Sequence, residues 1–218
     1  MASFLVIGMG RFGRSIATEL YQMKHDVLII DEREENISDI VDQVTDAIIG
    51  DAKDEAVLRS LDIYSFDSVI VAMAGDIEGS VLTTIMLKEM GAKMLICKAR
   101  NEWHMKILTQ IGADKVVRPE YDMGKRVAHS LAHRNTTDYL EISQEYGVLE
   151  LVTPSSWANK TISKNNLRRK YGITVMAVRC KGTDNVIFSP NADVMLSEGD
   201  VLTVVGSKQD LDVISILK

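Results

Sequence analysis

The chain has 218 residues, enough for one large domain or two smaller ones. Hydrophobic residues make up 46% and charged residues 26%, as in an ordinary soluble globular protein. The net charge of −6 argues against general binding to nucleic-acid phosphates. The two cysteines, Cys97 and Cys180, lie far apart in apolar runs, so we expect reduced, buried thiols and neither a disulfide nor a metal site.

The apolar runs are all much shorter than the roughly 20 residues that span a bilayer. The first run, 4–7, leads directly into a glycine-rich loop, which favours a strand over a signal peptide. We therefore expect a cytoplasmic protein that reaches a membrane only through a partner.

The glycine-rich loop has the spacing G-x-G-x-x-G, formed by Gly8, Gly10 and Gly13, between an apolar strand and a helical pattern. Gly8 permits the sharp turn, Gly10 lets a phosphate approach the backbone, and Gly13 lets the helix lie close to the strand. The free N–H groups of the first helical turn then favour an anion.

A second apolar run, 27–30, ends at Asp31. This position places a carboxylate where it can accept hydrogen bonds from ribose hydroxyls, and its charge would repel a 2′-phosphate. Together with the glycine loop, Asp31 predicts a site for an adenosine-containing nucleotide.

Strands and helices continue to alternate up to about residue 133. Strands are expected at 47–49, 68–72, 94–97 and 115–117, and helices at 34–43, after Asp54, and at 79–90, 102–111 and 122–133. In the helix 79–90, the side chains expected to face inward are Leu82, Ile85, Met86 and Met90. The alternation predicts a Rossmann-like, doubly wound α/β fold with a parallel sheet. The strand tips at Asp31, 50–52, 72–75, Lys98 and Glu120 should then converge with the glycine loop on one crevice.

After 134–137 the pattern changes, and strands cluster instead of alternating with long helices. Strands are expected at 138–143, 147–152, 173–179, 186–188 and 201–205, with helices at 164–171 and after Ser207. This predicts a small α+β domain at 136–218, following a nucleotide-binding domain at 1–135. Its modest core suggests that the second domain dimerises.

Three stretches carry a family resemblance: the glycine loop 6–13, the tip 50–52 and the run 118–124. They resemble the N-terminal half (TrkA-N) of the RCK domain, which regulates K⁺ conductance. The run 189–206 is similar to the C-terminal RCK subdomain, TrkA-C. The resemblance extends over essentially the whole chain and is strongest to the regulatory subunits of Ktr-type potassium uptake systems (KtrA/KtrC-like).

The resemblance implies a regulatory subunit without enzymatic turnover. Such subunits dimerise and assemble into octameric rings beneath a membrane-embedded Ktr/Trk-type K⁺-translocating subunit. They bind ATP or ADP, and NAD(H) in some relatives, and the nucleotide alters the ring and biases the gate.

By the matching motifs, Arg11 would face the terminal phosphates, also in a neighbouring subunit's site, while Lys98 would lie near the phosphates. Asp31 would hold the ribose, and Asp51 with Ala52 would border the adenine. Glu120 would help bind a cation, Mg²⁺ or Na⁺, at a subunit interface, and the helix after it would cross over to the partner. The predicted nucleotide site therefore comprises Gly8, Met9, Gly10, Arg11, Phe12, Gly13, Asp31, Glu32, Asp51, Ala52, Ala74, Lys98 and Glu120.

In this family the C-terminal domain often binds cyclic di-AMP at its dimer interface. The matching stretch is 160–170, where Arg168 would engage a phosphate and the apolar side chains Ile162, Leu167 and Pro190 would form walls. Ser163 stands where relatives often have a second aliphatic residue. On the residues alone, the cations of this stretch also fit a solvated helix end.

Two other functions stay open on the residues alone: an NAD-dependent oxidoreductase, and a free-standing redox or ligand sensor. The chain has no G-x-S-x-G elbow and no G-x-x-x-x-G-K-[ST] loop. The pair His129 and His133 has metal-ligand spacing but lacks the glutamate of H-E-x-x-H, so we do not expect a metal there.

Overall fold

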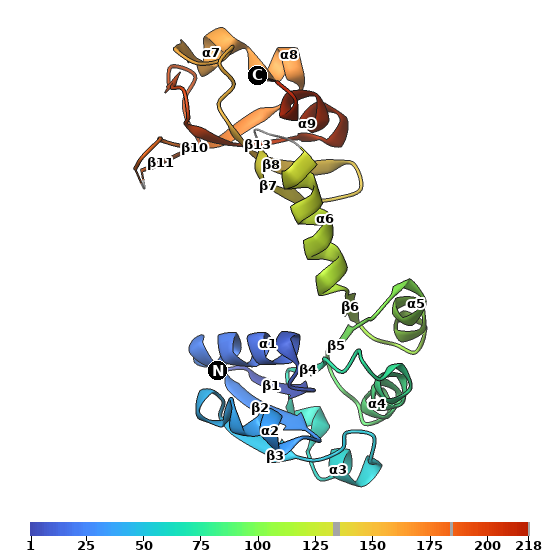
Figure 1. The fold of residues 1–218 in the computed structure, drawn as a ribbon. Coiled ribbons are helices and arrows are strands. Elements are labelled where there is room, and N and C mark those ends of the chain that lie inside the picture. Colours follow the sequence, from blue (N-terminus) through green and yellow to red (C-terminus); the bar gives the residue numbers. More distant parts are fainter. Residues whose placement is uncertain (133–135, 184, 218) are drawn as a thin grey trace. The chain divides into compact units, whose positions relative to one another are not determined.

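A computed structural model describes residues 1–132, 136–183 and 185–217 and divides the chain into two compact units, Met1–Pro119 and Glu120–Lys218 (Figure 1). Each unit has its own hydrophobic core. The domain boundary expected between residues 135 and 136 falls at 133–135, which lie outside the described residues.

The first unit is built on a six-stranded parallel sheet with the strand order β3-β2-β1-β4-β5-β6. This is the order of a dinucleotide-binding Rossmann fold, in which the chain reverses direction across the sheet between β1 and β4. The predicted fold class is confirmed. The strands are β1 (Ser3–Ile7), β2 (Asp26–Asp31), β3 (Asp46–Ile49), β4 (Ser68–Val71), β5 (Leu95–Lys98) and β6 (Lys115–Val117).

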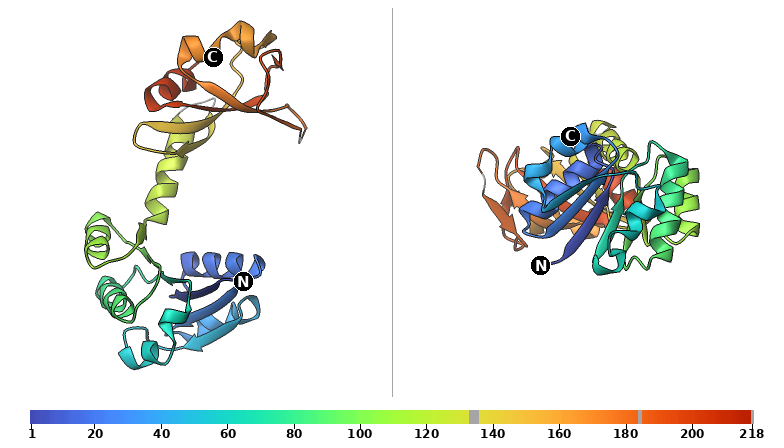
Figure 2. Two further views of the ribbon diagram at one scale, coloured as in Figure 1. Left: turned by 180° about the vertical axis from the view of Figure 1, so that it is seen from behind. Right: turned by 90° about the horizontal axis from the view of Figure 1, so that it is seen from below.

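Helices cover both faces of this sheet because successive strand side chains alternate between the faces. Val6 of β1 packs in a core with helix α1, whereas Leu5 and Ile7 pack in a second core with α3, α4 and α5. Figure 2 shows α1 on one side of the sheet and α4 and α5 on the other. The helices are α1 (Arg11–Gln22), α2 (Glu34–Ser38), η1 (Val41–Gln43), α3 (Glu55–Arg59), η2 (Ile63–Ser65), α4 (Ile77–Glu89) and α5 (Glu102–Gln110).

Two predictions for this unit are wrong in detail. The helix expected at 34–43 is broken into α2 and η1, because Ile40 leaves the helical region with φ −134°. In α4, Leu82 is 44% exposed and does not face inward. The sheet-facing side of α4 carries small hydroxyl residues, and Leu82 lies on the other side. The buried residues of α4 are Gly79, Ser80, Thr83, Thr84, Met86 and Leu87, so the inward orientation predicted for Met86 is confirmed.

The long helix α6 (Pro119–Ala132) begins at the last residue of the first unit and packs within the second. It starts three residues earlier than predicted, because proline fits the first turn of a helix. Arg126 Nε donates to Asp138 Oδ1 at 2.6 Å, and the rings of His129 and Tyr139 stack with centroids 4.6 Å apart. These contacts join α6 to the first strand of the second unit.

The second unit has a five-stranded antiparallel sheet in the order β11-β10-β13-β8-β7, and a two-stranded ribbon of β9 and β12. The helix predicted at 164–171 is two short helices, because Asn166 adopts the left-handed region with φ 48°. The elements are β7 (Thr136–Glu141), β8 (Tyr146–Val152), β9 (Lys160–Thr161), α7 (Ile162–Asn165), α8 (Leu167–Tyr171), β10 (Thr174–Arg179), β11 (Val186–Phe188), β12 (Met195–Leu196), β13 (Val201–Ser207) and α9 (Lys208–Ser215).

Candidate functional site

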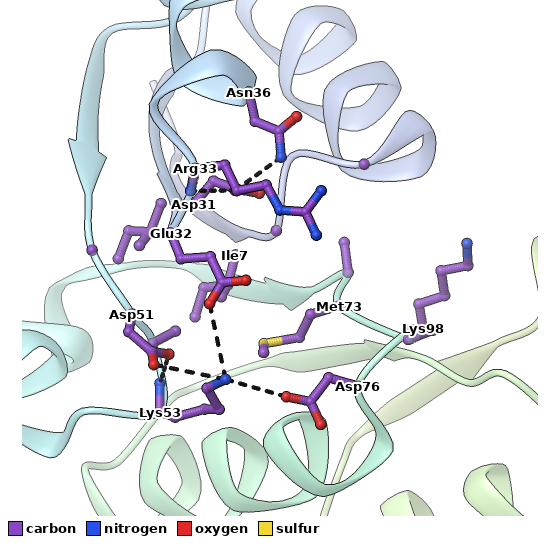
Figure 3. A pocket seen from close by; sticks show the side chains of 18 residues that line it. Ile7, Asp31, Glu32, Arg33, Asn36, Asp51, Lys53, Met73, Asp76 and Lys98 are labelled. Atoms are coloured by element: carbon purple, nitrogen blue, oxygen red, sulfur yellow. Dashed lines mark hydrogen bonds and ion pairs between the residues drawn. The ribbon is translucent and has the colours of Figure 1, made fainter.

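A cavity of about 620 Å³ lies at the carboxyl ends of the strands in the first unit (Figure 3). This is the edge at which open parallel sheets bind ligands. Its volume is in the range of small-molecule sites. It is lined by Ile7, Gly8, Gly10, Ile30, Asp31, Glu32, Arg33, Asn36, Gly50, Asp51, Ala52, Lys53, Ala72, Met73, Ala74, Gly75, Asp76 and Lys98.

The glycine loop has a backbone that only glycines allow at two of its positions. Gly8 has φ +93°, a conformation that L side chains rarely adopt. A Cβ on Gly13 would lie 2.0 Å from the carbonyl oxygen of Gly8, so the start of α1 contacts the strand end directly. A Cβ on Gly10 would meet nothing within 4 Å, and this residue lines the cavity. The space beside Gly10 is therefore open for a ligand.

The amino terminus of α1 differs in charge from those of α3, α4 and α5. Each of those helices has an Asp or Asn side chain as cap and a glutamate in its first turn. At α1, Gly10 provides no side-chain cap, the first turn has no acidic residue, and the first residue is Arg11. Free N–H groups and a cation together leave this helix end positive, so it suits an anion.

The carboxylate of Asp31 organises the loop. Its Oδ2 accepts the backbone N–H of Met9 at 2.6 Å, and its Oδ1 accepts Arg33 N–H and Asn36 Nδ2, both at 2.9 Å. A carboxylate accepts about four hydrogen bonds. These three contacts leave about one acceptor position for a ligand hydroxyl.

At the other end of the cavity, Lys53 lies among three carboxylates (Figure 3). Its Nζ is 3.3 Å from Asp76, 3.7 Å from Asp51 and 3.9 Å from Glu32. The hydrogen bond to Asp76, helped by the other two charges, raises the pKa of Lys53. The pKa of Asp76 is lowered, first by the N–H of Gly79 and then by Lys53. This ammonium partly neutralises an acidic end of the cavity.

Most of the predicted nucleotide-site residues line the cavity: Gly8, Gly10, Asp31, Glu32, Asp51, Ala52, Ala74 and Lys98. Met9 is fully buried in a hydrophobic core, and Gly13 fixes the packing of α1. Arg11 is exposed at the start of α1 and is not among the lining residues. The Lys98 ammonium lies 5.7 Å from the ring centroid of Phe12. Glu120 belongs to the second unit.

Sequence reasoning missed several lining residues, chiefly Arg33, Asn36, Lys53 and Asp76. All four follow a strand tip that was recognised: Arg33 and Asn36 follow Asp31, and Lys53 follows the tip at 50–52. Asp76 comes directly after the tip at 72–75 and is also the cap of α4. The signal that would have found them is nearness to a recognised tip.

The residues predicted for cyclic di-AMP lie in the second unit. Ser163 and Arg168 are exposed, and Ile162 and Pro190 are half-buried. Leu167 is only 2% exposed because it packs in the core of this unit, so it offers no exposed apolar wall.

Within the ranges that the structure describes, no three His, Cys, Asp or Glu side chains are grouped to hold a metal ion. No helix in those same ranges is long and apolar enough to cross a membrane.

The strand order, the glycine loop and the carboxylate at the tip of β2 define a Rossmann-type domain, joined to a small domain with an antiparallel sheet. The chain belongs to the family of TrkA-N and TrkA-C domain proteins: the TrkA-N domain matches residues 4–119 and the TrkA-C domain matches 148–215. This confirms the resemblance.

Two relatives from Bacillus subtilis (strain 168) are similar over nearly the whole chain. The chain is 42% identical to Ktr system potassium uptake protein C and 40% identical to Ktr system potassium uptake protein A. Each match covers 95% of this chain and 93% of the relative. A solved structure described as the GsuK channel bound to NAD has a similar fold, with TM-score 0.68 and 20% identity, over 96% of this chain and 38% of that chain.

Proposed function

We propose that this protein is a cytoplasmic, nucleotide-binding regulatory subunit of a membrane K⁺ uptake system, and that it acts without turnover. Its similarity to two Ktr potassium uptake proteins supports the transport role. It would lie at the inner face of the membrane, bound to a K⁺-translocating Ktr/Trk-type subunit, as the family resemblance implies.

The observation that carries the nucleotide-binding role is the uncapped amino terminus of α1 beside the open space at Gly10. A diphosphate or triphosphate placed there would accept the free N–H groups and offset the positive helix end. ATP and ADP are the proposed ligands. NAD(H) is the second candidate, supported by the structurally similar channel described as bound to NAD.

The remaining lining residues suit the nucleoside. Asp31 has about one acceptor position left after its three contacts with the loop. The neighbouring Glu32 would then accept the second ribose hydroxyl. Asp51 and Ala52, at the tip after β3, would border the adenine, and Lys98 would approach the phosphates from the tip of β5.

Regulation would operate by population shift among the shapes of a ring, which according to the family resemblance is an octamer assembled from dimers. Two nucleotides bias the ring differently only if they contact its shapes differently. A γ-phosphate contact from Arg11, a charge-assisted hydrogen bond, would supply about 1.5–3 kcal/mol. That corresponds to about a tenfold or greater preference at each site.

Two further ligands follow from the family resemblance alone and stay predictions. Cyclic di-AMP would bind at a dimer interface of the second unit through Arg168, Ile162 and Pro190. A cation, Mg²⁺ or Na⁺, would bind with the help of Glu120.

A redox sensor is less well supported, because its reactive thiol would have to be accessible and ionised. Cys97 is fully buried, and burial raises its pKa from 9.0 to about 11. Cys180 is half-buried, so the expectation of buried thiols holds for Cys97 and is wrong for Cys180. For an oxidoreductase, sustained NADH oxidation by the purified protein would be needed.

Calorimetry with ATP, ADP, NADH and cyclic di-AMP on the purified chain tests the proposal. We expect ATP and ADP to bind, with a clear difference in affinity. In Arg11→Ala the two affinities should become nearly equal, because only the γ-phosphate distinguishes the ligands. Full retention of the preference would exclude this role for Arg11, and no binding of any adenine nucleotide would overturn the function.

A further inference from the structure

The second unit contains a cavity of about 720 Å³ that the proposed function does not use. Its size is within the range of ligand sites. It lies beside α7 and α8 and is lined by Ser156, Trp157, Lys160, Lys164, Asn165, Asn166, Arg169, Lys170 and Tyr171.

Two asparagines build this cavity. Asn166 takes the left-handed conformation, φ 48°, and bends the chain between α7 and α8. This bend brings Lys164, before it, and Arg169, after it, to the same cavity. Asn165 Nδ2 donates to the carbonyl oxygens of Trp157 at 3.0 Å and Thr161 at 3.2 Å, which ties α7 to the preceding turn. The frame is therefore fixed by hydrogen bonds before any ligand arrives.

The lining carries four cations, Lys160, Lys164, Arg169 and Lys170, and no carboxylate. In the described part of the chain none of the four forms an ion pair, although Lys160 Nζ donates to the carbonyl oxygen of Ser156 at 2.9 Å. Many other cations of this acidic chain do pair with carboxylates: Arg14, Lys53, Arg59, Lys88, Lys106, Lys125, Arg126, Arg179 and Lys208.

Four neighbouring like charges repel one another, so an anion from outside would be strongly favoured. The carbonyl ends of α7 and α8 offset little of this charge, because these helices have only four and five residues. An arginine guanidinium grips phosphate oxygens in pairs, and lysines add point charges around it.

We propose that this cavity binds a ligand with two or more linked or clustered phosphate groups. Much of its lining belongs to the stretch 160–170 matched to cyclic di-AMP, but none of the residues predicted to contact that ligand lines the cavity: Ile162, Ser163, Leu167, Arg168 and Pro190. A soluble oligophosphate and the clustered phosphate headgroups of an anionic membrane present the same chemistry. The experiment separates these two sources.

Two aromatic residues of the cavity lining, Trp157 and Tyr171, can report on ligand binding. Trp157 is only 2% exposed and its ring centroid lies 5.4 Å from that of Tyr171. The Lys170 ammonium lies 4.9 Å from the Tyr171 centroid, and its hydrogen bond is the main cause of the lowered pKa of Tyr171. An anion that draws Lys170 away therefore changes the surroundings of the Trp157–Tyr171 pair.

Calorimetry on the full chain with inorganic tripolyphosphate, with ADP present to occupy the first cavity, is the primary test. We expect saturable binding that weakens about tenfold or more in Lys164→Gln/Arg169→Gln. Arg168→Gln is the matched control, because it removes the neighbouring charge of the same helix but not a lining residue. It should change the affinity by less than about twofold.

Two further measurements locate the ligand and identify its source. The chain has two tryptophans, so Trp103→Phe leaves Trp157 as the sole emitter, and its emission should shift on titration. Sedimentation with vesicles of equal parts phosphatidylcholine and phosphatidic acid tests the membrane source with the same variants. Binding to either probe that requires Lys164 and Arg169 supports the proposal and names the source.

Equal weakening for each charge removed in Arg168→Gln and in the double variant would mean diffuse surface attraction and would overturn the proposal. Absence of saturable binding to both probes would do the same. Neither result bears on ADP binding in the first unit, which is measured separately, so the failure of one proposal is distinguishable from the failure of the other.

Discussion

The two cavities of this protein balance their charges in different ways. In the first unit, Lys53 lies within 4 Å of three carboxylates, and Asp31 is held by three hydrogen bonds. In the second unit, four cations line a cavity without a carboxylate among the lining residues. The first cavity is therefore largely neutralised by its own side chains, except at the end of α1, whereas the second needs an anion from solution.

This difference shows where each proposed ligand would gain its binding energy. At the first cavity the gain comes mainly from backbone N–H groups and from shape, which a glycine loop provides, and the proposed contacts of Arg11 and Lys98 add to it. At the second it comes from charge, which salt screens. Ligand binding in the second unit should therefore be much more sensitive to ionic strength.

The largest expected effect is at the glycine loop, where the close contact between α1 and the strand end should be needed both for stability and for nucleotide binding. Gly13→Ala would place a Cβ 2.0 Å from the Gly8 carbonyl oxygen, and both atoms belong to packed backbone. We expect the free energy of unfolding to fall by about 3 kcal/mol, measured by urea unfolding. Nucleotide binding, measured by calorimetry, should also be lost because the start of α1 moves.

Gly10→Ala is the matched control, since its Cβ would meet nothing within 4 Å in the unliganded chain. Stability should change by less than about 1 kcal/mol. The new methyl group would occupy the space proposed for the phosphates, so affinity should fall about tenfold or more. Unchanged nucleotide affinity would place the phosphates elsewhere.

An effect of intermediate size is expected where cations of the second unit do pair with a carboxylate. Glu141 accepts hydrogen bonds from Lys125 and from Lys208, the latter at 2.7 Å. These contacts, that of Lys125 first, lower the pKa of Glu141 from 4.5 to about 2. A carboxylate with a lowered pKa stabilises the fold above its unfolded pKa, and this stabilisation is lost as the pH falls through the folded pKa.

Urea unfolding at stepwise lower pH measures this contribution. Because Glu141 is about one-third exposed, we expect Glu141→Gln to cost about 1 kcal/mol at neutral pH. The difference between the two proteins should shrink between pH 4.5 and about 2. A difference that stays constant over this range would show that packing, and not charge, carries the effect.

Much of the first unit could be predicted from the sequence, because its signals are local. Apolar runs marked the strands, and the glycine spacing and Asp31 marked the crevice. The residues around Lys53 were missed because three carboxylates from different loops meet there only in the folded chain. The prediction that Leu82 faces inward was wrong, because α4 buries hydroxyl side chains where hydrophobic ones were expected.

In the second unit the basic stretch was recognised from the sequence, but its separation into two short helices was not. A single helix was expected at 164–171, and such a helix would spread its cations around its circumference. The left-handed conformation of Asn166 instead brings Lys164 and Arg169 to one cavity, which Arg168 does not line. A backbone conformation available to asparagine at little cost determines this arrangement, and apolar periodicity carries no information about it.

The smallest expected effect tests the comparison directly, by removing charge from each cavity and measuring stability without ligand. Lys53→Gln leaves Asp51, Asp76 and Glu32 without their shared ammonium. The melting temperature should fall at low salt and recover at high salt.

Lys164→Gln/Arg169→Gln removes unpaired like charges, so it should raise stability at low salt by about 0.5 kcal/mol. Salt screens both effects, so their opposite signs at low salt distinguish a self-neutralised cavity from one that requires an external anion. A loss of stability in the double variant would mean that its cations have structural partners.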